Sequence, residues 1–152
     1  MIAISFLGTG NYQEVTYSDN SFNTSLYTKY FTEALDHIYK PEKIFIVMTD
    51  DAQKMHSEQL KSKIKFEPIL IPKGKSTDEI WQMFSLIAES IPENSELIID
   101  ITHGFRSQPM LALSIAIFLR VVKSVQVNKI IYGAFEAKDE NNIAPIFDLT
   151  SF

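Results

Sequence analysis

The stretch from Leu97 to Leu119 constrains the fold more than any other part of this sequence. It begins with the apolar run Leu97-Ile98-Ile99, which is typical of a strand buried on both faces. After a short polar turn comes an apolar segment from Met110 to Leu119, which is too long for a strand and predicts a buried helix. A buried strand that leads into a buried helix indicates an open α/β sheet. Because ligands bind such sheets at the carboxyl ends of the strands, the polar turn is the expected site.

The turn itself concentrates polar and small residues, namely Asp100, Thr102, His103, Gly104 and Arg106. Ser107 is a candidate N-cap and Pro109 suits the first helical turn, so the helix would point its positive end at this cluster. An arginine can fork onto a phosphate, and a glycine lets the backbone approach a ligand closely. These features together favour a phosphate-bearing ligand. The ordinary alternatives are that Asp100 caps a loop, that Arg106 is a solvated surface charge and that His103 is structural.

A second loop follows the first predicted strand, Ile2–Leu7, and reads Gly8-Thr9-Gly10-Asn11-Tyr12. The third glycine of a dinucleotide-binding fingerprint is missing, because Gln13 stands in its place, so a conventional NAD site is not favoured. The loop amides could still face a ligand, with Asn11 and Tyr12 available for hydrogen bonding or base stacking. An ordinary tight turn is the alternative.

The remaining sequence alternates between strand-like runs and helical spacing. Strands are predicted at residues 15–17, 44–48, 66–71, 127–135 and 144–149. Helices are predicted from Thr24 to just before Pro41, from Ala52 to Lys63 with Asp50 or Asp51 as N-cap or ribose ligand, and from the capping box at Ser76 to Ile91. A charged linker at 138–142 predicts that the last two strands are antiparallel. The expected fold class is α/β: a Rossmann-like, mostly parallel sheet flanked by helices, with a C-terminal antiparallel β-hairpin.

Composition limits the classes of partner. The 152 residues fit one domain, and 45% hydrophobic with 22% charged residues is ordinary for a globular protein. The net charge of -5 argues against direct binding of long nucleic acids, although local cations and dipoles can still hold a small polyphosphate.

Other partners are also not expected. Residues 1–7 lack the basic region of a signal peptide, and residues 110–119 are too short to span a bilayer, so we expect a cytoplasmic protein with no membrane partner. There is no cysteine, and the three histidines, His37, His56 and His103, have no metal-ligand spacing. No metal and no cofactor are therefore expected.

The pattern Asp100-x-Thr102-His103-Gly104 closely resembles the DxTHG motif of CRISPR-associated proteins that carry a CRISPR-associated Rossmann fold (CARF) domain. The opening segment Ser5–Tyr12 resembles the other signature loop of that group. The closing segments Tyr132–Ala137 and Pro145–Thr150 are a third likeness, so the resemblance runs from end to end. The first two motifs together are specific, whereas either alone is much weaker.

The resemblance implies one CARF domain over residues 1–152, either stand-alone or excised from a longer effector. CARF domains bind cyclic oligoadenylates, the second messengers of type III CRISPR antiviral defence, as homodimers with the ring across the two-fold axis. Cyclic tetra-adenylate is the first expected ligand and cyclic hexa-adenylate the second. By this resemblance one wall of the site would be Gly8, Thr9, Gly10, Asn11 and Tyr12, and the other Asp100, Thr102, His103, Gly104 and Arg106.

Some domains of this kind are ring nucleases, which open the ring without a metal and leave a 2′,3′-cyclic phosphate. The catalytic candidates here are His103, Thr102 and Asn11. Whether this chain cleaves the ring is left open by the sequence. The alternatives are a non-catalytic sensor domain of a longer effector such as a HEPN ribonuclease, a pure dimerisation module and, more distantly, another Rossmann-like nucleotide-binding enzyme.

Overall fold

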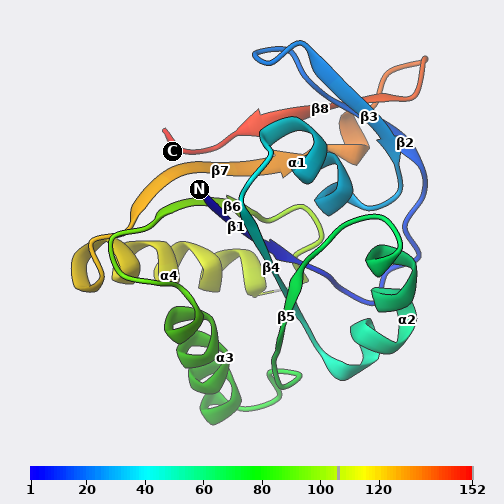
Figure 1. Cartoon of the computed structure of the whole chain (residues 1–152). Helices are drawn as coiled ribbons and strands as arrows, with labels where there is room; N and C mark the ends of the chain where they lie inside the picture. The colour runs from blue at the N-terminus through cyan, green and yellow to red at the C-terminus, as the bar shows by residue number, and fades with distance from the viewer. Residues whose placement is uncertain (106, 152) are drawn as a thin grey trace.

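A computed structural model describes residues 1–105 and 107–151 of this chain. Within them eight strands form one sheet in the order β3-β2-β8-β7-β6-β1-β4-β5 (Figure 1). The strands are β1 (Ile2–Phe6), β2 (Val15–Asp19), β3 (Thr24–Thr28), β4 (Lys43–Met48), β5 (Glu67–Leu70), β6 (Glu96–Asp100), β7 (Gln126–Gly133) and β8 (Ile143–Asp148). The helices are α1 (Phe31–Tyr39), α2 (Asp50–Lys61), α3 (Thr77–Ser90), α4 (Gln108–Val122) and the short 3-10 helix η1 (Phe135–Ala137).

The strand directions confirm the predicted fold class. β7, β6, β1, β4 and β5 run parallel to one another, and β8 runs antiparallel to β7. The predicted C-terminal hairpin is therefore present, although η1 lies between its strands. β1 and β6 are neighbours in register, with Ser5 opposite Asp100. This pairing brings the two signature loops together at the carboxyl edge of the sheet.

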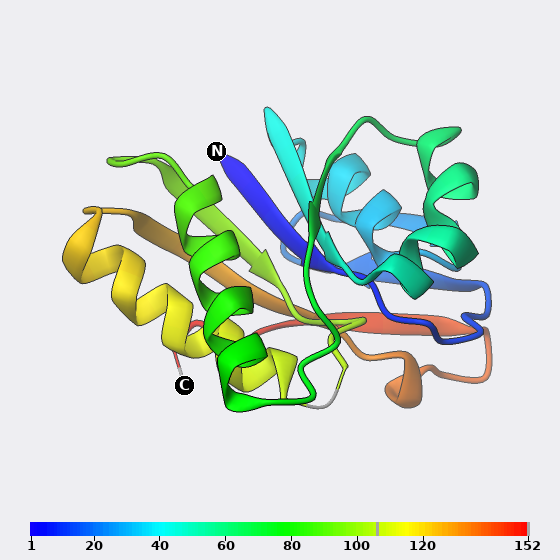
Figure 2. The same ribbon diagram turned by 90° about the horizontal axis from the view of Figure 1, so that it is seen from below.

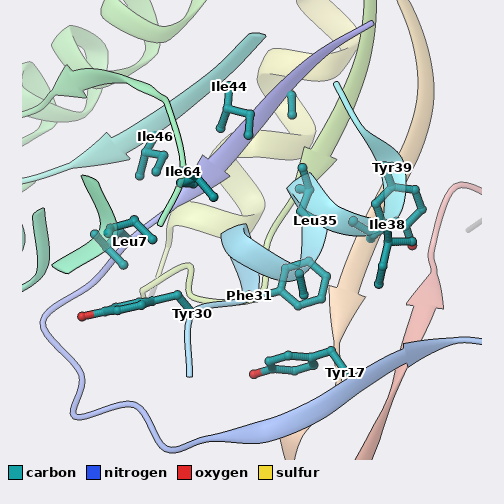
Figure 3. Packing of buried hydrophobic residues seen from close by; sticks show 14 of the residues in the cluster. Leu7, Tyr17, Tyr30, Phe31, Leu35, Ile38, Tyr39, Ile44, Ile46 and Ile64 are labelled. Carbon is teal, nitrogen blue, oxygen red and sulfur yellow. The ribbon is translucent and has the colours of Figure 1, made fainter. Parts of the chain in front are cut away.

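Two apolar layers hold the helices on opposite faces of the sheet (Figure 2). The first layer packs α1 and α2 against one face, and Figure 3 shows Phe31 from α1 lying over the ring of Tyr17. The two rings meet edge to face, with centroids 5.0 Å apart. The second layer packs α3 and α4 against the other face. In the described part of the chain no helix is both long and apolar enough to cross a membrane.

The predicted helix from Thr24 is wrong over residues 24–30, about two turns. Residues 24–28 form β3, which pairs antiparallel with β2, and the helix begins only at Phe31. Asn23 makes the turn between the two strands with a positive φ of 50°. The apolar spacing at Tyr27, Tyr30 and Phe31 mimicked a helix, but β2 also pairs with β8, far away in sequence. That long-range pairing fixes a strand that local periodicity does not reveal.

The helix caps were predicted in part. Ser76 caps α3 as expected, since its side chain accepts a hydrogen bond from the Glu79 amide at 3.2 Å. The prediction that Asp50 or Asp51 caps α2 is wrong, because Thr49 is the N-cap and accepts from the Ala52 amide at 3.3 Å. Both aspartates instead lie in the first turn, where their charge favours the helix dipole.

Candidate functional site

The carboxyl ends of β1 and β6 border a polar cavity of about 340 Å³. Four residues that the sequence singled out line it, namely Asn11, Tyr12, Thr102 and His103. The two signature loops, which are about ninety residues apart in sequence, therefore meet at one site. Gly8, Thr9, Gly10 and Gly104 belong to the same loops but do not line this cavity. Arg106 lies outside the described residues.

Asp100 is fully buried beneath the cavity and holds the turn together. Its Oδ2 accepts a 2.5 Å hydrogen bond from Ser5 Oγ on β1, and its Oδ1 accepts from the Thr102 amide at 2.8 Å. Because the single Ser5 proton goes to Asp100, the 2.7 Å contact between Ser5 and Thr32 makes Thr32 on α1 the donor. Burial raises the pKa of Asp100 to about 6, although the hydrogen bonds from Ser5 and Thr102 oppose the shift. The carboxyl group thus joins β1, β6 and α1 beneath the cavity.

Thr102 and Gln108 fix the two ends of the turn. Thr102 Oγ1 accepts a hydrogen bond from the Gly133 amide at 2.8 Å, which connects the turn to the end of β7. Gln108, the buried first residue of α4, accepts from the Phe105 amide at 2.8 Å through its side-chain oxygen. Ser107 occupies the N-cap position as predicted, but within the described residues its side chain makes no capping bond. The turn is therefore built by side chains from both flanking elements.

His103 reaches across the site to helix α1. Its Nε2 accepts a hydrogen bond from the Phe31 amide at 3.1 Å. Burial, with a smaller contribution from His56, lowers the pKa of His103 to about 3. The imidazole is therefore neutral at physiological pH, and the lone pair of Nε2 is occupied.

Tyr12 fills the space between two histidines. Its ring lies 3.9 Å from His103 and 5.0 Å from His56, measured between centroids. Its hydroxyl accepts from the Gly8 amide at 2.8 Å. A Cβ on Gly10 would lie 2.9 Å from the Tyr12 ring, so this position needs glycine for the loop to fold back. The first signature loop therefore folds back on itself, with the Tyr12 ring packed against both histidines.

His56 holds the first signature loop in place, and the sequence analysis missed this role. Its Nε2 lies 2.9 Å from the Gly10 carbonyl, which can only accept, so this nitrogen carries the proton. Its Nδ1 lies 2.7 Å from the Tyr30 hydroxyl, which also lies 2.9 Å from Gln59 Oε1. Burial lowers the pKa of His56, which favours a neutral ring. No motif surrounds His56 in the sequence, and only the packing of α2 brings it to the loop.

With this geometry established, comparison with protein families matches residues 2–140 to the CARF domain of the CRISPR system endoribonuclease Csx1. The chain belongs to the CARF domain family. The resemblance expected from the DxTHG motif is confirmed, and this CARF domain is one of the type III CRISPR group.

A curated relative points the same way. The CRISPR-associated protein MJ1674 of Methanocaldococcus jannaschii is 37% identical over 84 residues. The match covers 53% of this chain but 13% of that relative, so the chain spans a small part of its length. CARF domains in general bind cyclic oligoadenylates, which supports a sensing role for this one.

Two charged residues that were not among the predicted site residues also line the cavity of this CARF domain, the cation Lys29 and the carboxylate Glu136. Lys29, directly before α1, lines it, and its Nζ lies 5.2 Å from the centroid of the Tyr30 ring. Glu136 on η1 accepts from the Tyr132 hydroxyl at 2.7 and 2.8 Å. Burial and this carboxylate raise the pKa of Tyr132 to about 12, so it stays a donor. Tyr132 and Glu136 belong to the closing segment noted in the sequence. Lys29 was not considered, because it fell inside the helix that was wrongly predicted from Thr24.

Proposed function

We propose that this CARF domain binds a cyclic oligoadenylate in type III CRISPR antiviral defence, with cyclic tetra-adenylate first and cyclic hexa-adenylate second. The observation that carries the proposal is the meeting of the two signature loops at one polar cavity. Asn11, Thr102 and Lys29 supply hydrogen-bonding groups and a cation there, and Arg106 from the same turn is assigned to phosphate. The cavity lies at the carboxyl edge of the sheet, where ligands of open α/β folds bind.

The size of the cavity favours one part of the ring per protomer. Its volume of about 340 Å³ is at the lower end of the roughly 300–1,000 Å³ that hold a drug-sized ligand. That space suits one nucleotide unit and not a whole cyclic tetranucleotide. A ring with repeated phosphates could use the same cavity in each of two protomers, because a two-fold dimer presents identical residues to each half.

The outer face of α4 supports a homodimer. Its inner side is buried as expected, through Ala112, Ile115, Ala116 and Leu119. Its outer side exposes an apolar stripe formed by Met110, Leu113, Ile117 and Val121, of which Val121 is 78% exposed. An apolar cavity of about 280 Å³ continues the stripe beside Met110 and Leu149. Because the DxTHG turn directly precedes α4, two copies packed along this stripe would bring their turns together.

A second candidate function is cleavage of the bound ring. The three residues nominated for chemistry, His103, Thr102 and Asn11, all line the cavity, which supports it. In this reaction a ribose 2′-hydroxyl attacks the adjacent phosphorus and the bond to the 5′-oxygen breaks. The 2′-proton leaves, the 5′-oxygen gains a proton, and the products are a 2′,3′-cyclic phosphate and a 5′-hydroxyl. Positioning and charge stabilisation can supply much of the acceleration of such a step.

The alternatives predict a different ligand or a different fate for the ring. A sensor domain of a longer effector, such as a HEPN ribonuclease, would bind the ring and leave it intact. Another Rossmann-like nucleotide enzyme would prefer NAD or ATP. Calorimetric titration with cyclic tetra-adenylate, cyclic hexa-adenylate, linear tetra-adenylate, NAD and ATP separates ring binding from a nucleotide enzyme, and chromatography of the recovered ring separates a sensor from a ring nuclease. A ring should bind more tightly than its linear form, which must be ordered on binding. Tighter binding of NAD or ATP, or equal affinity for ring and linear forms, would reject the proposal.

A further inference from the structure

Helix α1 begins without a local cap. Its N-cap residue, Tyr30, has extended backbone angles, and among the described residues its side chain makes no capping hydrogen bond. The first amides of a helix need an acceptor, and a missing cap costs about 1 kcal/mol. His103, which is 72 residues away in sequence, supplies the acceptor for the Phe31 amide. The DxTHG histidine is thus the cap of a helix on the other side of the site.

This bond fixes the proton of the imidazole. A backbone amide only donates, so Nε2 must accept with a lone pair, and a neutral ring then carries its proton on Nδ1. In residues 1–105 and 107–151, Nδ1 has no hydrogen-bond partner, and yet it is not among the buried unsatisfied atoms. Since His103 lines the cavity, this N–H, which has no partner among the described residues, is available to a ligand.

We propose that His103 works as a neutral imidazole locked in one tautomer, whose Nε2 caps α1 and whose Nδ1–H donates a hydrogen bond to a phosphate or hydroxyl oxygen of the ligand. It is a binding and positioning residue in this role, and its Nε2 is not a general base. The capping role of Nε2 is seen in the protein without a ligand, whereas the donor role of Nδ1–H rests on the proposed function.

The surroundings of His103 favour this neutral state. A protonated ring would place a positive charge at the positive end of α1, which is unfavourable. Burial acts in the same direction by lowering the pKa of His103. Among the described residues, the titratable and charged groups around it are Tyr12 on the first loop, Tyr17 on β2, Lys29 before α1, His56 on α2, Asp100 on β6, Tyr132 on β7 and Glu136 on η1. The two nearby carboxylates are already engaged, Asp100 by Ser5 and Thr102 and Glu136 by Tyr132.

The first test is nitrogen NMR of the histidine rings in the free wild-type protein. We expect His103 to carry its proton on Nδ1 and to remain neutral from about pH 5 to 8, the range in which histidines usually change charge. His37, which is exposed on α1, identifies its own signal through His37→Gln and should leave the His103 signals unchanged. A proton on Nε2, or titration of His103 within that range, would overturn the proposal.

The second test separates the two nitrogens with two amides. The side chain of His103→Gln can place an acceptor near Nε2, and that of His103→Asn can place a donor near Nδ1. We expect Gln to keep hydrogen-exchange protection at the Phe31 amide, whereas Asn and Ala should speed exchange about five-fold, as loss of a cap does. Affinity for cyclic tetra-adenylate should show the opposite order, with Gln and Ala about ten-fold weaker and Asn closer to wild type.

If His103→Gln and His103→Asn behave equally in both measurements, the two nitrogens do not have the separate roles of cap acceptor and ligand donor. If wild type does not bind cyclic tetra-adenylate, the proposed function and the donor role both fail. The NMR and exchange results then still decide whether His103 caps α1, because they need no ligand.

Discussion

Ser5 on β1 donates a 2.5 Å hydrogen bond to the buried carboxylate of Asp100 on β6. The two residues are 95 positions apart and lie opposite each other in neighbouring strands. Thr32 donates to Ser5 in turn, so the chain of bonds extends into α1. The aspartate of the DxTHG motif therefore has a structural role, because its hydrogen bonds fix the turn that carries Thr102 and His103.

Asp100 should make stability depend on pH. Its pKa of about 6 lies above the ordinary value of 3.8 for an aspartate, so between these values the folded state binds more protons than the unfolded state. Stability must then fall as pH rises from about 4 to about 6. Asp100→Asn removes this contribution. The unfolding free energy of wild type relative to the variant should therefore drop by about 2–3 kcal/mol over that interval. Urea denaturation followed by fluorescence across this pH range measures the difference.

The control for this experiment is Glu140→Gln on the exposed linker between η1 and β8. Other carboxylates contribute to both wild type and variant, so only the difference between them reports on Asp100. An equal slope for Glu140→Gln, or a difference that rises with pH, would contradict the assignment.

The apolar stripe on α4 should govern assembly. Ile117→Glu and Val121→Glu place charge on side chains that are 62% and 78% exposed, so the folded protomer can tolerate them. Either change should convert a dimer into a monomer in light scattering without changing the circular dichroism spectrum, because a buried unpaired charge disfavours an interface. Met55→Glu is the matched control, since Met55 is an exposed apolar residue on α2. A wild-type protein that stays monomeric with and without ligand would reject the shared site.

The parts of the fold that could be predicted are those with strong local patterns. β6 contains a short unbroken apolar run and α4 a much longer apolar stretch, so their type and order follow from residues 97–119 alone. The antiparallel end was predictable because the charged linker interrupts two strand-like runs. Ser76 was predictable as a cap because its partner, Glu79, is three residues away.

The parts that could not be predicted depend on contacts between distant segments. β3 pairs with β2, which in turn pairs with the distant strand β8. The local sequence of residues 24–28 does not indicate these pairings. His56 reaches the first loop only through the packing of α2, and His103 caps a helix that starts 72 residues earlier. The motif residues of the site were therefore predictable, whereas the residues that position them were not.

Two cations should set affinity for the ligand phosphates: Lys29, which lines the cavity, and Arg106, which follows the DxTHG motif in the sequence. Lys29→Ala should weaken binding of cyclic tetra-adenylate about ten-fold or more, and Arg106→Ala by about 1.5–3 kcal/mol if its bond is charge-assisted. Lys54→Ala is the control, because Lys54 is exposed on α2 and does not line the cavity. Calorimetry at two salt concentrations checks the result, since loss of a phosphate contact should also reduce the salt dependence. Equal losses for Lys29→Ala and Lys54→Ala would show that Lys29 acts only through bulk charge.

Ring cleavage can be separated from binding at Asn11. Asn11 is exposed and lines the cavity, so its amide can orient the reacting ribose or stabilise the phosphorane without supporting the fold. Asn11→Ala should leave affinity within a few-fold but slow ring opening by about 10²-fold, the scale of losing one such donor.

Gln13→Ala is the matched control, because Gln13 is also exposed and lines the same cavity. The assay incubates labelled cyclic tetra-adenylate with excess protein and EDTA and separates the products by chromatography. The in-line attack needs no metal, so activity should survive EDTA, and its rate should show no inflection from His103 between about pH 6 and 8. If wild type leaves the ring intact for hours, the domain is a sensor only; if Asn11→Ala and Gln13→Ala slow the reaction equally, Asn11 has no role of its own and Thr102→Val is the next variant to compare.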